Sequence, residues 1–360
     1  MRSLKVKTEI EKILEEKTSV IDKKIEKYIP RKYGRDSLIF TLGLPRYEYD
    51  VEAINEAIAK PIWEFLDRGG KRWRPNLFLL VCEALGAEPE KLLDFAIIPE
   101  VIHNGTLMID DVEDASELRR GKPCTYKLFG LDIAINAGNV MYYLPLLALI
   151  KNKDKLSLDK QNKIYEIYLQ EMIRLSFGQA MDIAWHRGLA KADEKQYLQM
   201  CIYKTGTLAR MAAKMAAVLA GASDDTVERM GKFAESIGVA FQIQDDILDL
   251  VGKKFAKKKG GLGQDITEGK RSLMVIHTLE KAKPADKKRL LKILNMHTTN
   301  QKLKDEAIKI IKKYGSIKYG KELARNMIEE SWKEIDRLLQ SSDAKEKLKA
   351  FANYLVERKI

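Results

Sequence analysis

Leu107-Met-Ile-Asp-Asp-Val-Glu-Asp114 is one of two stretches in which an apolar run ends in aspartates, and the other is Phe241-Gln-Ile-Gln-Asp-Asp-Ile-Leu-Asp249. In each, the aspartates stand at positions i, i+1 and i+4: Asp110, Asp111 and Asp114, then Asp245, Asp246 and Asp249. On an α-helix, i and i+4 share one face, and i+1 lies about 100° round the axis. Each stretch therefore predicts a helix that gathers three carboxylates at one end.

Such carboxylate clusters need a balancing charge. Unpaired, they would repel one another and lose hydration beside the apolar run. Carboxylate oxygens suit Mg²⁺, which is usually shared with the phosphates of a substrate. A solvated acidic helix end explains a single cluster well, but the same spacing in two stretches favours metal binding, so we expect Mg²⁺ as the cofactor.

The rest of the chain has helical spacing too, and no segment alternates like a strand. With only 9 prolines in 360 residues, long helices are favoured. Helices are predicted over 10–29, 50–66, 75–86, 89–114, 132–150, 158–186, 194–220 (broken near Thr205-Gly206), 225–251 and several ranges within 272–357, with loops at 31–49 and 252–264. We expect an all-α protein with an N-terminal helix and loop extension at 1–49 and a single large helical domain at 50–360.

Composition narrows the class of protein. Hydrophobic residues make up 45% of the chain, which excludes a disordered protein. The three cysteines show neither metal-ligand spacing nor an even disulfide framework. No apolar stretch reaches the roughly 18 residues of a membrane span, and no signal peptide is evident. We therefore expect a soluble cytoplasmic protein.

The net charge of +12 allows nucleic acid, an acidic membrane surface or small anions as partners. No helix-turn-helix, zinc-finger or base-stacking motif is evident, which argues against nucleic acid. The basic residues that accompany the aspartates are Lys71 and Arg74 beside Gly69-Gly70, Arg119-Arg120 after the first cluster, Lys204 at the predicted helix break, and Lys259 and Lys270 after the second cluster. A glycine turn before a helix start suits phosphate, although each basic group alone is more often a solvated surface feature.

Taken in order, these residues resemble the trans-prenyltransferase (polyprenyl synthetase) family of farnesyl, geranylgeranyl and longer polyprenyl diphosphate synthases. The resemblance spans about residues 50 to 280. Its elements are Gly-Gly-Lys71-x-x-Arg74-Pro, His103, DDxxD at 110–114, Arg119-Arg120-Gly-x-Pro, Lys204-Thr205, Gln242-x-x-DDxxD at 245–249, and Asp265-x-x-x-Gly-Lys270. One DDxxD motif is weak, but seven ordered elements are specific.

The resemblance implies helices around a central cavity, a homodimer, and condensation of isopentenyl diphosphate with dimethylallyl, geranyl or farnesyl diphosphate. By that resemblance, isopentenyl diphosphate is held by Lys71, Arg74, His103 and Arg120. Magnesium is bound by Asp110, Asp111, Asp114 and Asp245, supported by Asp246 and Asp249. The allylic diphosphate is held by Arg119, Lys204, Gln242, Lys259 and Lys270, and the developing carbocation is faced by Thr205 and Gln242, so Lys204, Thr205 and Gln242 are the catalytic candidates.

The chemistry suits these residue types independently. Breaking an allylic C–O bond leaves a cation and a diphosphate, and neutralising the leaving group in a dry site lowers the barrier. A second diphosphate site positions the isopentenyl double bond beside the cation. The released diphosphate can take the proton lost from the adduct, so no dedicated protein base is required.

Product length is expected to depend on Gly105 and Thr106, one helical turn before Asp110. Family members that stop at fifteen carbons commonly carry a bulky aromatic at one of these positions, whereas both residues are small here. We therefore expect a product of at least twenty carbons.

Three other functions stay open from the sequence: a terpene cyclase-like diphosphate lyase, a non-catalytic subunit of a heteromeric prenyltransferase, and a basic helical scaffold for membrane or RNA. The second complete DDxxD and the apparent isopentenyl diphosphate site argue against the lyase, and the intact aspartates argue against the non-catalytic subunit. A weak association with membrane surfaces is left open. The sequence assigns no role to the N-terminal extension or the lysine run at 253–259.

Overall fold

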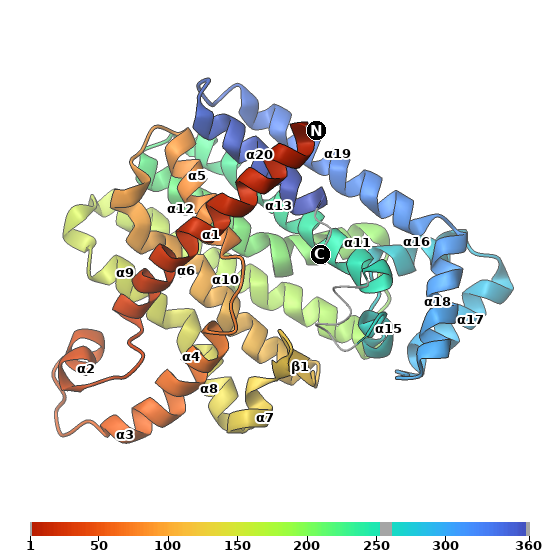
Figure 1. Ribbon diagram of the computed structural model, residues 1–360, viewed down its shortest axis with the longest axis horizontal. Helices are drawn as coiled ribbons and strands as arrows, with labels where there is room; N and C mark the ends of the chain where they lie inside the picture. The colour runs from red at the N-terminus through yellow and green to blue at the C-terminus, as the bar shows by residue number, and fades with distance from the viewer. Residues whose placement is uncertain (1, 253–260, 358–360) are drawn as a thin grey trace. The chain divides into compact units, whose positions relative to one another are not determined.

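A computed structural model describes residues 2–252 and 261–357, and this part of the chain is almost entirely α-helical, as the apolar spacing predicts (Figure 1). The elements up to residue 155 are α1 (Arg2–Tyr28), α2 (Arg35–Leu42), α3 (Val51–Ile54), η1 (Asn55–Ala59), α4 (Lys60–Leu66), α5 (Trp73–Ala84), α6 (Pro89–Glu113), β1 (Leu118–Arg119), β2 (Lys122–Pro123), α7 (Thr125–Phe129), α8 (Leu131–Tyr143), η2 (Leu144–Leu146), α9 (Leu147–Ile150) and η3 (Lys153–Lys155). Those that follow are α10 (Leu158–His186), α11 (Glu194–Cys201), η4 (Ile202–Gly206), α12 (Thr207–Ala220), α13 (Asp224–Val251), α15 (Gln264–Glu268), α16 (Leu273–Lys281), α17 (Pro284–Asn295), α18 (Gln301–Lys313), α19 (Ser316–Asp336) and α20 (Asp343–Glu357).

The chain divides into two compact units. Unit 1 comprises Met1–Glu166, Ala212–Asp224 and Ser342–Leu348, and unit 2 comprises Ile167–Met211, Asp225–Ser341 and Lys349–Ile360. The first aspartate cluster belongs to unit 1 and the second to unit 2. The expected division into 1–49 and 50–360 stays a prediction, but α1 groups with the helices of unit 1.

In unit 1, α6 is the central helix and packs against α5 and α8 (Figure 1). Pro89 opens α6, as proline at a first helical position should. The side chains of Ile97, Ile98, Val101 and Ile102 on α6 are fully buried. This apolar burial stabilises the helix that ends in Asp110 and Asp111.

In unit 2, α13 is the buried helix that ends in the second cluster. Its Phe233 ring meets Trp332 of α19 edge to face, with centroids 5.6 Å apart. Gly320 of α19 packs closely on α13, because a Cβ at that position would lie 3.4 Å from Ile247 Cδ1 and 3.5 Å from Ile243 Cγ2. The core of unit 2 therefore fixes the helix that carries the second cluster.

Three local expectations were wrong. The expected loop at 31–49 contains α2. Ser37 donates to the Gly34 carbonyl and accepts from the Gly34 N–H, so local polar contacts start this helix without the apolar spacing on which the prediction relied. The basic loop after the first cluster contains the short antiparallel pair β1–β2. The expected helix break near Thr205 is a single π-helical turn, η4, between α11 and α12.

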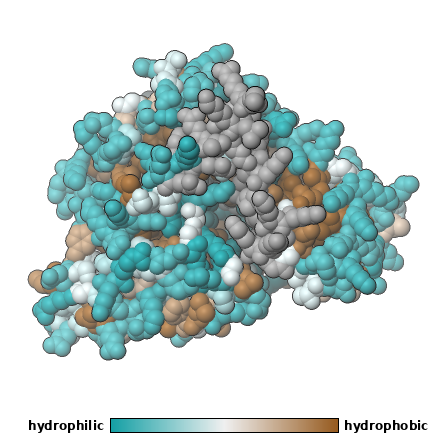
Figure 2. Space-filling view, in the orientation of Figure 1, coloured by the Kyte–Doolittle hydropathy of each residue, from teal (hydrophilic) through white to brown (hydrophobic). Residues whose placement is uncertain are grey.

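Two helical segments are long and apolar enough to cross a membrane by length and composition alone. No apolar stretch of that length was expected from the sequence. They are Pro89–Glu113 and Leu131–Ile150, whose apolar windows are 61% and 44% buried within the protein. Core helices of water-soluble proteins meet the same criterion, so this finding is weak evidence for a membrane span. The face shown in Figure 2 is largely hydrophilic, with separate hydrophobic patches.

Candidate active site

The first aspartate cluster lies at the C-terminal end of α6, as predicted. Asp110 and Asp111 belong to its last turn, and Asp114 directly follows Glu113. Asp111 is fully buried and accepts a hydrogen bond from Arg119 Nε at 2.8 Å. Burial raises the pKa of Asp111, although Arg119 opposes the rise. Asp110 keeps 19% of its side chain exposed, so this helix end presents both a clamped and an accessible carboxylate.

A basic group lies beside this cluster in unit 1. Arg74 of α5 is 3% exposed, and its Nε has no hydrogen-bond partner among the described residues. Burial lowers the pKa of Arg74 to about 10, an effect that Glu100 opposes and Arg120 strengthens. Burial also lowers the pKa of Arg120 to about 10 and that of His103 well below its usual value, where neighbouring arginines add to the effect. This concentration of positive charge would be relieved by a bound anion.

The turn before α5 holds these cations close together. A Cβ on Gly70 would lie 3.2 Å from Arg72 Nη1 and 3.4 Å from Arg120 Nη2, so both guanidinium groups lie against this glycine, whose φ of +156° other residues rarely adopt. Arg120 Nη2 donates to Asn104 Oδ1 at 3.1 Å, while Lys71 is exposed at the turn. The charges of Arg74 and Arg120 both act on His103, so three of the four residues predicted to hold isopentenyl diphosphate lie close together, and their role as its binding site stays a prediction.

Sequence reasoning missed Arg72, Glu100 and Asn104. Arg72 occupies an "x" position of the motif, yet it is 2% exposed and contacts Glu100 Oε1 through Nη1 at 3.3 Å. Glu100 and Asn104 lie on the buried part of α6. A charged or amide side chain within an apolar run is unusual, and this could have marked both as candidate functional residues.

Gly105 has a packing role that the sequence did not indicate. A Cβ at this position would lie 2.8 Å from the Gly138 carbonyl oxygen and 2.8 Å from Met141 Cβ, both on α8. Phenylalanine at Gly105 would therefore separate α6 from α8, so it would not be a clean test of product length. Thr106, whose Oγ1 donates to the His103 carbonyl at 2.7 Å, is the better test.

A hydrogen-bonded chain in unit 2 joins the second cluster to the predicted catalytic residues. Thr205 Oγ1 donates to Gln242 Oε1 at 2.9 Å, and Gln242 Nε2 donates to Asp246 Oδ1 at 2.7 Å. Tyr197 Oη donates to the other Asp246 oxygen at 2.7 Å. Burial, strengthened by Asp265, raises the pKa of Asp246 to about 7 despite these bonds. Both Asp246 oxygens are thus occupied by protein side chains, and its role in supporting magnesium stays a prediction.

Asp249 also has a supporting position. It is 1% exposed, and its two oxygens accept from the backbone N–H groups of Gln264 and Asp265, each at 3.2 Å. Lys270 Nζ lies 3.7 Å from Asp265 Oδ1 and 2.6 Å from Glu268 Oε2. Asp249 therefore connects α13 to the segment that carries Lys270.

Lys204 is held by Asp182 of α10, and His186 of the same helix contacts that aspartate; the sequence singled out neither residue. Asp182, 8% exposed, pairs through one oxygen with Lys204 Nζ and lies 2.8 Å from His186 Nε2 through the other. Burial acts to raise the pKa of Asp182, but Lys204 and His186 hold it well below the usual value. This carboxylate is therefore ionised and orients the lysine. In the sequence, Asp182 is a lone aspartate on an amphipathic helix, and that pattern does not indicate Lys204 as its partner.

Glycines fix the position of η4 itself. A Cβ on Gly178 of α10 would lie 2.4 Å from the Lys204 backbone nitrogen, and one on Gly238 of α13 would lie 2.6 Å from Gly206 Cα. Because these contacts are with backbone, they cannot be relieved by a rotamer change. The glycines therefore place Lys204 and Thr205 against α10 and α13.

The aspartate carboxylates are suited to a magnesium ion that is bound together with a substrate diphosphate. Among residues 2–252 and 261–357, no three His, Cys, Asp or Glu side chains are arranged as a metal-binding group. Substrate-linked Mg²⁺ needs only one or two carboxylates, together with phosphate oxygens and water. Asp110, Asp114 and Asp245 are partly exposed, so these three offer suitable donors. Lys259 lies outside the described residues.

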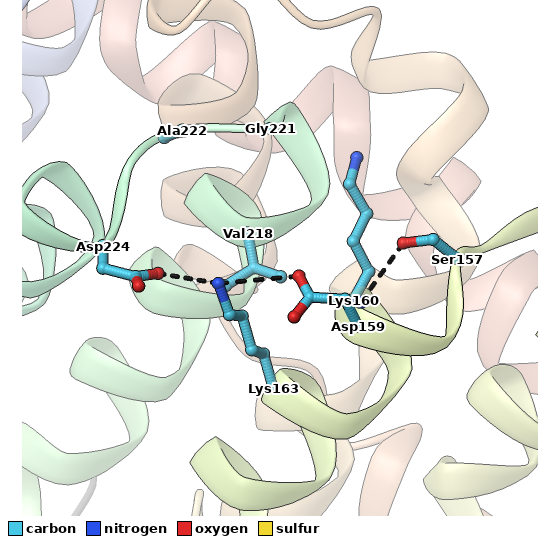
Figure 3. A pocket seen from close by; sticks show the side chains of 8 residues that line it. All are labelled: Ser157, Asp159, Lys160, Lys163, Val218, Gly221, Ala222 and Asp224. Carbon is cyan, nitrogen blue, oxygen red and sulfur yellow. Dashed lines mark hydrogen bonds and ion pairs between the residues drawn. The ribbon is translucent and has the colours of Figure 1, made fainter.

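A surface pocket of about 190 Å³ in unit 1 is lined by other residues (Figure 3). Lys163 Nζ lies 2.8 Å from Asp224 and 3.5 Å from Asp159, while the Lys160 backbone N–H donates to Ser157 Oγ at 3.3 Å. None of its lining residues is a predicted site residue, and Lys163 is neutralised by two carboxylates. We assign no role in the reaction to this pocket.

Comparison with known proteins gives a consistent result. A family model described as "Polyprenyl synthetase" matches residues 55–311. A short chain isoprenyl diphosphate synthase of Methanothermobacter thermautotrophicus is 34% identical over 84% of this chain and 91% of its own, and a geranylgeranyl pyrophosphate synthase of Neocamarosporium betae is 30% identical over 87% and 92%. The crystal structure of a geranylgeranyl pyrophosphate synthetase from Pyrococcus horikoshii superposes with a TM-score of 0.84 at 30% identity, covering 98% of this chain and 99% of that one.

Proposed function

Because the chain belongs to the polyprenyl synthetase family, we propose that it condenses isopentenyl diphosphate with an allylic diphosphate, releasing diphosphate and forming an all-trans polyprenyl diphosphate. The buried basic group of unit 1 is the observation that carries this proposal. Arg74 and Arg120 have depressed pKa values and converge with His103 in a largely buried place. Charge-assisted hydrogen bonds from arginine suit a diphosphate, so this group binds isopentenyl diphosphate.

The aspartate clusters and Lys204 serve the allylic substrate. Asp110, Asp114 and Asp245 would hold Mg²⁺, which when bound neutralises the charge that develops on the diphosphate as the C–O bond breaks. Lys204, oriented by Asp182, donates to the same leaving group. The side-chain oxygens of Thr205 and of Gln242 on α13 are hydrogen-bonded to each other. Such polar oxygens stabilise a developing carbocation.

The product is twenty carbons or longer. Thr106 is small, so it leaves the level below the first cluster open to a growing hydrocarbon tail. Two relatives named above are a geranylgeranyl pyrophosphate synthase and a geranylgeranyl pyrophosphate synthetase, which supports the same length. Dimethylallyl, geranyl and farnesyl diphosphate are all candidate primers.

Product analysis tests the proposal. Wild-type protein with Mg²⁺, isopentenyl diphosphate and farnesyl diphosphate should give a polyprenyl diphosphate longer than fifteen carbons by mass spectrometry. Asp110→Ala and Asp245→Ala should abolish turnover while circular dichroism shows unchanged helicity. Cyclic hydrocarbon from farnesyl diphosphate alone would instead indicate a terpene cyclase-like lyase, and no product would indicate a non-catalytic subunit.

A homodimer and a cytoplasmic location are further proposals. Leu169, Ile173 and Phe177 repeat every four residues on α10 and are 57%, 54% and 66% exposed. Such a row of apolar side chains is typical of a surface that another protein covers, and a second copy of this chain is the occupant we propose. Light scattering should give twice the chain mass, and Phe177→Glu should reduce it to one chain.

A further inference from the structure

Arg72 links the N-terminal helix to the basic group of unit 1. We propose that Asp22 of α1 is a positioning residue for the isopentenyl diphosphate site and acts through Arg72. This inference rests on the proposed function of that site. It gives the N-terminal segment, which the sequence left without a role, a specific part in substrate binding.

The Arg72 side chain is held at three points. Its Nε donates to Asp22 Oδ1 at 2.9 Å, its Nη1 to Glu100 Oε1 at 3.3 Å, and its Nη2 to the Leu66 carbonyl at 3.1 Å. Only 2% of Arg72 is exposed. A guanidinium buried to this degree keeps its place only while its charged partners remain.

The backbone of Arg72 needs that support. Its φ is +44°, a left-handed conformation that is unfavourable for any residue other than glycine and persists when surrounding contacts impose it. Arg72 is also the N-cap of α5, and its carbonyl accepts a hydrogen bond from Asn76 Nδ2 at 2.9 Å.

The substrate-binding residues flank Arg72 directly. Lys71 precedes it, and Arg74 follows two residues later in the first turn of α5. A change in the φ of Arg72 would therefore change the direction of both side chains relative to His103 and Arg120. Loss of Asp22 should be felt by the substrate that these residues bind.

Helix α1 is attached to unit 1 independently of Asp22. Lys24 Nζ and Lys27 Nζ both contact Asp94 Oδ1 of α6, at 3.3 and 3.1 Å, and the Ile29 carbonyl accepts from Trp63 Nε1 at 3.0 Å. Asp94→Asn therefore weakens the attachment of α1 without touching Arg72. It is a matched control for Asp22→Asn, since both changes remove one carboxylate charge between α1 and its neighbours.

Steady-state kinetics on the full chain test the inference. We expect Asp22→Asn to raise KM for isopentenyl diphosphate roughly five- to tenfold, because misplaced binding groups lose a fraction of their interaction with substrate. KM for farnesyl diphosphate should stay within about twofold of wild type, since that substrate uses other residues. Asp22→Glu should recover much of the loss, and Asp94→Asn should leave both KM values unchanged.

Other results would overturn the inference. If Asp22→Asn leaves KM for isopentenyl diphosphate unchanged, or raises both KM values together, or behaves like Asp94→Asn, then Asp22 only attaches a helix. Calorimetric titration with isopentenyl diphosphate measures the same loss of binding without turnover. If the wild-type protein forms no elongated product, the proposed function has failed, which is a different outcome from an active wild type with an insensitive Asp22.

Discussion

Alanine at Gly178 should displace Lys204 and slow the reaction. A Cβ at this position would lie 2.4 Å from the Lys204 nitrogen and 2.7 Å from the Tyr203 carbonyl carbon. Ordinary contacts begin at 3.4 Å. The η4 backbone and α10 must therefore separate by 1.0 Å (3.4 minus 2.4).

That displacement sets the expected magnitude. A shift of about 1 Å in a positioned catalytic group can reduce the rate about 100-fold, or about 2.7 kcal/mol of transition-state free energy. Overpacking costs about 1–3 kcal/mol of stability, of which alanine recovers about 1 kcal/mol through its higher helix propensity. The net loss of stability is then about 0–2 kcal/mol, so the protein should still fold while its kcat falls about 100-fold.

Steady-state kcat with farnesyl and isopentenyl diphosphates measures the effect, and a thermal melt reports stability. Gly320→Ala is the matched control, because Gly320 is also a buried helical glycine but would meet only flexible side-chain atoms, nearest Met274 Sδ at 3.0 Å. It should retain kcat within about threefold, since flexible atoms can yield. Wild-type kcat in Gly178→Ala, or an equal loss in Gly320→Ala, would refute the argument that backbone contact places Lys204.

Three further predictions concern the same site. Asp182→Asn removes the charge that orients Lys204, so kcat/KM for the allylic diphosphate should fall about tenfold while KM for isopentenyl diphosphate is unchanged; equal effects on both substrates would contradict this. Because the pKa of Asp246 is raised to about 7, the metal-free folded protein keeps a proton that the unfolded chain loses above about pH 4. Its stability should therefore fall as the pH rises from about 4 to about 7, and Asp246→Asn should flatten that slope in melts with chelator present; an unchanged slope would contradict the assignment. Thr106→Phe should shorten the product to fifteen carbons by mass spectrometry, and an unchanged product would show that the tail does not pass Thr106.

The sequence predicted the elements that depend on local signals. Pro89 begins α6 where expected, and both aspartate clusters lie at the ends of buried helices, as predicted. Both features could be predicted because apolar spacing and charge are properties of the local sequence. The basic residues of unit 1 converge as the ordered motifs implied. Resemblance, rather than periodicity, assigned a role to each of them.

Contacts between distant residues could not be predicted in the same way. Asp182 meets Lys204 across 22 residues and Asp22 meets Arg72 across 50, and nothing in the local sequence of either aspartate names its partner. Gly105 appeared to be a small residue beside a product tail, whereas its size is required by α8. The π-helical turn η4 depends on packing against Gly178 and Gly238, so the sequence indicated only an irregularity there.

We propose that both aspartate clusters hold divalent ions on one leaving diphosphate. A crystal structure of the protein with Mg²⁺ and an unreactive thiolo analogue of farnesyl diphosphate tests it directly. We predict metal ions that bridge the analogue's diphosphate to Asp110 or Asp114 on one side and to Asp245 on the other, with Lys204 in contact. A diphosphate bound away from these aspartates, or clusters too far apart to share it, would contradict the account.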